Sequence, residues 1–198
     1  ILYVGVREDG TPALAWRPAP AGAQRLPARM LALGARFDSA LRHAVQRGVS
    51  GEDGSRGYAL AHDSATRAVQ EAFIAIAAEE TPTLAAVLRH SGDASHRALA
   101  AQMLAYGTDR TLVVRELLHA VTDASDEVRN NAARALAVLA GWANDHPEAG
   151  VVIPAGVFID YLNAVRWTDR NKGTFALLPL TARRDASLLV AIRARALR

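Results

Sequence analysis

Four arginines recur along the chain at nearly regular intervals, and their guanidinium groups could either bind an anion or fasten one part of the fold to the next. They are Arg67, Arg97, Arg129 and Arg170, and their spacings are 30, 32 and 41 residues. A guanidinium group offers five N–H donors and stays charged, so it can hold a carboxylate and a carbonyl oxygen together. Because the position recurs with the surrounding pattern, we predict that each arginine stabilises its own repeat rather than lining an anion site.

Residue types that perform catalysis or bind metals form no familiar arrangement here. The chain has no cysteine, and none of its six histidines forms the H-E-x-x-H pair of a zinc hydrolase. His62-Asp63 is the best local pair for a ligand and its orienting carboxylate, but a capping or turn role fits it better. Lys172 lacks the glycines of a P-loop, no G-x-S-x-G occurs, and residues 52–55 lack the alternating acidic ligands of a calcium loop. The sequence therefore predicts no catalytic residue, no metal site and no cofactor.

The arginines stand in four segments with the periodicity of a helix that buries one face, at 63–79, 93–107, 125–141 and 168–183. Ser, Thr or Asp precedes each apolar stripe, where a side-chain oxygen can accept an unpaired backbone N–H. A second helix is expected after each one, at 82–89, 111–121, 157–165 and 187–197. Short turns make neighbouring helices antiparallel, and helix pairs that stack on one another form a solenoid.

The run from Asp123 to Ala140, DASDEVRNNAARALAVLA, resembles the short HEAT repeat of the PBS-lyase-like HEAT families. The shared features are an acidic turn, then Val-Arg, then an Ala-rich helix that ends in Leu. The resemblance covers residues 61–197 and is clearest in the second and third segments. It implies a mainly α fold, a right-handed α-solenoid of about four HEAT-like helix pairs, that binds another molecule, usually a protein.

The chain ahead of the repeats divides into two further parts. Residues 1–26 are predicted to form a β-hairpin, with strands at 1–7 and 13–17 around Asp9-Gly10, and a Pro-rich linker. A lone hairpin is marginal in water, so we interpret it as the remnant of an upstream region. Residues 27–60 are predicted to form a helical connector, 28–46, and a polar Gly-rich loop, 48–57. The HEAT-like repeats occupy residues 61–198.

The long interval between Arg129 and Arg170 predicts an insertion at 142–154, which a stack of helices can accommodate only as a projecting loop. The last helix carries Arg193, Arg195 and Arg198 near its end, where cations complement the helix dipole. These arginines also suit the polar outer face of a terminal repeat. We therefore expect the array to end with this helix.

Charge and hydropathy narrow the classes of partner. The net charge of +3 comes from the first 57 residues, and the rest of the chain is neutral, so no continuous basic stripe for nucleic acid is predicted. No apolar run reaches the roughly 20 residues of a membrane span. A cysteine-free, Arg-rich composition fits the bacterial cytoplasm better than the periplasm.

The leading hypothesis is a non-catalytic protein-binding or scaffolding module whose partner is another protein or another region of its own longer chain. The second helices are expected to line its concave surface. The candidate binding residues lie on the polar sides of these helices: Arg89, Arg115, Glu116, His119, Asp160 and Asn163.

Two alternatives remain open. The chain could be an accessory domain of a larger enzyme whose active part lies upstream. It could also be a nucleic-acid-binding protein similar to HEAT-like DNA glycosylases, which cradle a lesion in a concave solenoid with Trp and Asp. The cluster at residues 167–171, which contains Trp167 and Asp169, raises this possibility. Tryptophan more often buries its ring against a neighbouring helix, and a neutral solenoid does not favour phosphate.

Overall fold

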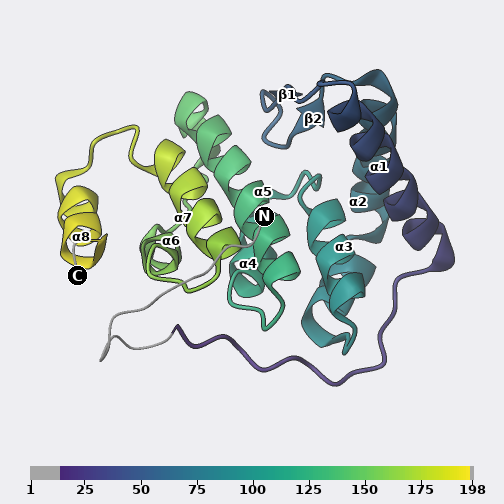
Figure 1. Cartoon of the computed structure of the whole chain (residues 1–198), viewed down its shortest axis with the longest axis horizontal. Coiled ribbons are helices and arrows are strands. Elements are labelled where there is room, and N and C mark those ends of the chain that lie inside the picture. Colours follow the sequence, from purple (N-terminus) through teal and green to yellow (C-terminus); the bar gives the residue numbers. More distant parts are fainter. Residues whose placement is uncertain (1–13, 197–198) are drawn as a thin grey trace.

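The computed structural model describes residues 14–196, and these form a row of helices stacked side by side (Figure 1). Helices cover more than half of the chain, as predicted. In chain order the elements are α1 (Ala28–Gln46), β1 (Glu52–Asp53), β2 (Leu60–Ala61), α2 (Ser64–His90), α3 (Ala94–Leu104), α4 (Arg110–Ala120), α5 (Asp126–Asp145), the 3-10 turn η1 (Pro147–Ala149), α6 (Gly156–Tyr161), α7 (Trp167–Leu180) and α8 (Ala186–Ala196).

The predicted helix pairs are present. Non-helical backbone at Glu80, two residues before Pro82, divides α2 into a first and a second helix. In chain order the other pairs are α3 with α4, α5 with α6, and α7 with α8. Helix α6 ends at Tyr161, earlier than the expected residue 165, and it packs on α7 and α8 of the next pair. The first helices form one layer, in which α2 packs on α3, α3 on α5, and α5 on α7. The predicted connector helix is also confirmed, because α1 has the expected bounds and packs on α2.

Local sequence explains where the helices begin and how closely they approach. The carboxylates of Asp63, Asp93 and Asp109 accept backbone N–H groups in the first turns of α2, α3 and α4. Alanines line the interface between the first helices, and Ala101 and Ala133 are fully buried there. Small side chains let helix axes approach closely, so the Ala-rich pattern sets a tight stack.

Residues 14–27 are an extended strap that lies against the repeats, not a free linker. Figure 1 shows it running along the lower edge of the helix row from near α6 to the start of α1. The Trp16 ring meets the Tyr161 ring edge to face, with 5.7 Å between the centroids. The backbone N–H of Arg17 donates to the carbonyl of Thr122 at 2.7 Å, in the turn after α4.

The strap also bonds to the turn between α2 and α3. The Gly92 N–H donates to the Gly22 carbonyl at 2.7 Å, and the Leu26 N–H donates to Nδ1 of His96 at 2.8 Å. These bonds satisfy backbone groups that a Pro-rich segment cannot pair within a helix or sheet of its own. The strap therefore joins the turns of successive repeats along one edge of the stack.

The only sheet in the part of the chain that the structure describes is β1 paired antiparallel with β2, and it stands where a Gly-rich loop was predicted. The hairpin predicted at the front falls mostly on residues 1–13, which lie outside the described residues, as do residues 197–198. Leu14–Arg17, the described part of its second strand, is extended without strand pairing.

The insertion after the third arginine projects as expected. Helix α5 continues to Asp145, Leu139 stays buried, and the exposed η1 turn follows, ending at Gly150 with a left-handed backbone. By contrast, the expectation of a polar outer face on α8 is wrong in part, and the expectation that the array ends with this helix stays a prediction. Helix α8 packs on α6, none of its described side chains is buried, and Leu189 and Val190 are exposed.

The close packing of α6 on α7 gives a direct test of the stack. A Cβ atom at Gly173 would stand 2.7 Å from Cβ of Tyr161 and 2.9 Å from the Phe158 carbonyl oxygen. We expect Gly173→Ala to lower the free energy of unfolding, measured with urea, by about 1–3 kcal/mol. Gly141→Ala is the control, because its Cβ would have 4.0 Å of space in a helix interior. It should raise stability by about 0.5–1 kcal/mol, and equal effects of the two substitutions would contradict the packing.

Candidate functional site

Arg97 is buried and ties its repeat to the next one. Its Nε and Nη2 donate to the two carboxylate oxygens of Asp123 at 2.9 and 2.8 Å, and Nη1 donates to the Ser91 carbonyl at 2.9 Å. Asp123 is itself buried and comes from the turn before α5. The second repeat is thereby joined to the third by a bidentate pair, the strongest geometry available to a guanidinium group.

Arg129 repeats this arrangement one step further along. It donates to both carboxylate oxygens of Asp169 in α7, at 2.9 and 2.6 Å, and to the carbonyls of Asp123 and Ala124. The Trp16 ring of the strap covers it, with the guanidinium carbon 4.0 Å from the ring centroid. A buried ion pair is stabilising only when its polar atoms have partners, and here each of the three guanidinium nitrogens has one. We therefore propose that Arg97 and Arg129 fix the stacking of successive repeats.

The other two arginines follow the pattern only in part. Nη1 of Arg170 donates to the carbonyl six residues earlier, that of Ala164, as Arg97 and Arg129 do in their own repeats. Arg67 is different, because its side chain is 35% exposed and lies 3.8 Å from Asp53 and 3.5 Å from Glu71. It joins α2 to β1 at the surface, where ion pairs contribute little to stability.

The structure brings four of the six predicted surface residues together. Arg89 and Arg115 both donate to the carboxylate of Glu116, at 2.5 and 2.9 Å, and His119 lies beside Arg89. Glu116 is only 2% exposed, so its assignment to an open surface is wrong, and the reason is that two arginines enclose it. Sequence reasoning missed a fifth member of this cluster, Arg17 of the strap, because no periodicity places a strap residue against α4.

The remaining two predicted surface residues lie elsewhere, between α6 and α8. Asp160 pairs with Arg195, and the Asn163 side chain donates to the Arg195 carbonyl at 3.3 Å. The six candidates therefore form two separate groups, each held by contacts within the chain.

His119 sits among cations and is partly buried. Nη1 of Arg17 lies 2.5 Å from its Nε2, and an arginine can only donate, so Nε2 is the acceptor and the neutral ring carries its proton on Nδ1. Burial, with the charges of Arg17 and Arg89, lowers the pKa of His119 to about 4, although Glu116 and Asp123 oppose the shift. Protonation would remove the acceptor that helps to hold the strap.

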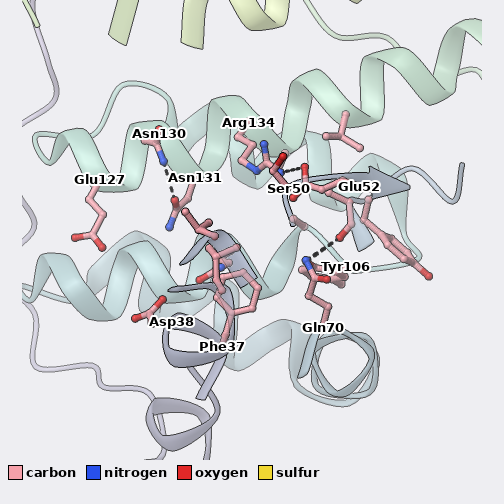
Figure 2. A pocket seen from close by; sticks show the side chains of 18 residues that line it. Phe37, Asp38, Ser50, Glu52, Gln70, Tyr106, Glu127, Asn130, Asn131 and Arg134 are labelled. Carbon is pink, nitrogen blue, oxygen red and sulfur yellow. Dashed lines mark hydrogen bonds and ion pairs between the residues drawn. The ribbon is translucent and has the colours of Figure 1, made fainter. Parts of the chain in front are cut away.

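A groove opens on the opposite side, on the layer of first helices (Figure 2). Helix α1 forms one wall, α5 the other, α3 the floor, and the β1–β2 hairpin closes one end. Its volume is about 490 Å³. We call it the α1–α5 groove, and it is lined by Phe37, Asp38, Leu41, Val45, Ser50, Glu52, Tyr58, Ala59, Gln70, Gln102, Ala105, Tyr106, Glu127, Asn130, Asn131, Arg134, Ala135 and Val138.

The groove combines an apolar surface with an excess of negative charge. Figure 2 shows Asp38 and Glu127 toward one end, and Arg134, paired with Glu52, toward the other. Asp38 and Glu127 are exposed, and neither has an ion-pair partner among residues 14–196. Burial raises the pKa of the Tyr106 hydroxyl, which donates to the Ala59 carbonyl at 3.0 Å. The site offers recognition chemistry rather than a group poised for proton transfer.

The residues whose types could support catalysis or metal binding do not lie together in the part of the chain that the structure describes. In the described part of the chain no group of three or more His, Cys, Asp or Glu residues could hold a metal ion. Asp169, a member of the Trp-Asp cluster, is buried with both carboxylate oxygens bonded to Arg129, so it does not face a concave surface. Among residues 14–196, no helix has both the length and the apolar character of a membrane span.

A family comparison agrees with the repeat geometry. The family model of HEAT repeats matches residues 81–150, from the second half of α2 to the insertion. The match supports a HEAT-repeat family for this part of the chain, and the helices on either side of it stack in the same row. No curated protein and no solved structure matches it. HEAT repeats are generally protein-interaction or scaffold modules and are typically non-catalytic.

The buried pair between the third and fourth HEAT repeats can be tested with a double-mutant cycle. Arg129→Met leaves Asp169 buried without its partner, and we expect it to lower the free energy of unfolding by about 3–5 kcal/mol. Arg129→Met/Asp169→Leu should cost less than Arg129→Met alone, because no unpaired charge remains. The exposed pair of Arg166 with Asp126 is the control, and Arg166→Met should change stability by about 1 kcal/mol or less. A double variant as unstable as the sum of the singles would argue against the pair.

The low pKa of His119 predicts how stability depends on pH. The unfolded chain takes up this proton near pH 6.5, whereas the folded chain does so only near pH 4. Stability from this residue is therefore fully present above about pH 6.5 and is lost as the pH falls toward 4. We expect the urea midpoint of the wild type to fall more between pH 7.5 and pH 5 than that of His119→Gln. Parallel changes in both proteins would show that His119 does not contribute.

Proposed function

We propose that this chain is a non-catalytic protein-binding module that holds a short segment of a partner protein in the α1–α5 groove. The observation that carries this proposal is the groove itself, an amphipathic, net acidic channel between α1 and the first helices of the HEAT repeats. Its volume of about 490 Å³ lies within the range of specific ligand pockets and suits a few side chains rather than a whole domain.

Apolar contacts would supply part of the binding free energy. Leu41 and Val45 on the α1 wall are exposed, and they face a channel that also contains Phe37, Tyr106 and Val138. Covering such surface removes apolar area from water, at roughly 25 cal/mol per Å². A partner segment with one or two large apolar side chains would use this part of the groove.

Charge would select the partner. Asp38 and Glu127 favour a lysine or arginine on the bound segment, and the paired Glu52 and Arg134 leave the far end nearly neutral. The same carboxylates repel phosphate, so the groove does not support the nucleic-acid alternative. The amide side chains of Asn130 and Asn131 on the α5 wall offer hydrogen bonds to the backbone of an extended peptide.

The surface on the second helices supports this function less well. Glu116 already accepts from Arg89 and Arg115, so a partner would have to break these bonds before forming its own. In the α1–α5 groove the exposed carboxylates of Asp38 and Glu127 can bind a partner without first breaking an ion pair within the chain.

The test is a fluorescence-anisotropy screen of short peptides, in which Leu, Lys, Arg or Glu is fixed at each position in turn. We expect the tightest peptides to combine a large apolar residue with Lys or Arg a few positions away. Asp38→Arg/Glu127→Arg should weaken their binding by about tenfold or more, and Leu41→Asp should do the same by removing apolar contact. Glu148→Arg, on the exposed η1 turn, is the matched control and should leave binding unchanged. Peptide binding that is equally strong in all four proteins would place the site elsewhere.

A further inference from the structure

A second groove, separate from the α1–α5 groove, lies at the other end of the array, between α7 and α8. Its volume is about 540 Å³, and its lining is largely apolar: Leu162, Asn171, Thr174, Phe175, Leu177, Leu178, Thr181 and Ile192. Leu178 is 74% exposed and Phe175 is 39% exposed. Helix α8 packs on α6, and in Figure 1 its ribbon stands apart from α7 at the end of the row.

The repeat register shows that Leu178 occupies a position that a following helix covers elsewhere. Leu178 stands eight residues after Arg170, as Ala137 stands eight residues after Arg129. Ala137 is only 3% exposed, because α7 packs on that face of α5. The face of α7 that carries Leu178 is therefore exposed, whereas the equivalent face of α5 is covered by α7. Helix α7 presents a leucine there in place of an alanine, and this leucine is largely exposed.

The stretch of sequence that supplies most of this groove's lining is basic. Between positions 171 and 195 the sequence has five basic residues and one acidic residue. The Lys172 amine lies 5.5 Å from the centroid of the Phe175 ring at the groove's edge. Arg183, Arg184 and Arg193 are exposed, and the part of the chain that the structure describes offers none of them an ion-pair partner. Apolar surface bordered by unpaired cations suits an apolar stripe bordered by carboxylates.

We propose that the α7–α8 groove docks an acidic amphipathic helix of a partner protein, which packs on α7 as α7 packs on α5. Leucine-sized side chains at i, i+3 or i+4, and i+7 of that helix fill the groove around Phe175 and Leu178. Glutamate or aspartate on its flanks meets Arg183, Arg184 and Arg193. A second copy of this chain is disfavoured as the occupant, since the basic end would meet the same charges on its twin.

The experiment uses the full chain and two synthetic helical peptides of about 18 residues, each with leucine every third or fourth position and alanine between. One carries glutamate on its polar face, and the other carries lysine at the same positions. By fluorescence anisotropy we expect the glutamate peptide to bind about tenfold or more tightly than the lysine peptide. Leu178→Asp should weaken its binding by about tenfold, and Arg183→Glu/Arg193→Glu should remove the preference for glutamate.

Val152→Asp is the matched control, because Val152 is an equally exposed apolar residue in the insertion, and it should leave binding unchanged. Asp38→Arg/Glu127→Arg should also have no effect, which separates this proposal from the function of the α1–α5 groove. The proposal is overturned if neither peptide binds, if both bind equally, or if Val152→Asp weakens binding as much as Leu178→Asp. Sedimentation velocity completes the test, since a dimer that Leu178→Asp abolishes would make a second copy the occupant.

Discussion

Two buried guanidinium groups are each held by a carboxylate of the following repeat, and both grooves are lined by helices that these pairs join. Removing such charges from water is costly, and the cost is offset only when each buried guanidinium nitrogen finds a partner. Arg97 and Arg129 meet this condition with a bidentate carboxylate and a carbonyl six residues earlier in the chain. Because these bonds are directional, α5 and α7 hold a defined position on α3. Helices α5 and α3 form a wall and the floor of the α1–α5 groove, so their relative position also fixes the shape of this groove.

The strap couples the front of the chain to this frame. Trp16 lies over Arg129, and Arg17 reaches the cluster around His119, so one short segment contacts the third repeat and the end of α4. An aromatic face over a guanidinium group adds attraction and keeps water away from the buried pair with Asp169. The strap is therefore part of the structure that stabilises the array, although it has no helix or sheet of its own.

Most of the helices could be predicted from the sequence, whereas the contacts between distant parts of the chain could not, for physical reasons. Helical periodicity and Asp caps are local signals, so the bounds of α1 and the four helix pairs could be predicted. The carboxylate partners could not, because Asp123 stands six residues before Arg129 whereas Asp169 stands one before Arg170. The strap has no periodicity, and its contacts are bonds between backbone groups far apart in the chain. The α1–α5 groove arises because α1 packs on α2 and stays clear of α5. This arrangement depends on tertiary contacts, which the residue pattern within a single helix does not predict.

The two grooves differ in the sign of their charge, and the overall composition hides this difference. A net charge of +3 for the whole chain does not reveal the acidic channel near one end of the array or the basic stretch around the apolar groove at the other. A segment that suits Asp38 and Glu127 is repelled by Arg183 and Arg193, and the reverse holds for a segment that suits the arginines. Charges of like sign at a contact cost more than charges of opposite sign gain, so each groove excludes the ligand of the other. On the two binding functions that we propose, selectivity comes from where the few charges without an ion-pair partner lie, whereas the buried pairs contact no ligand.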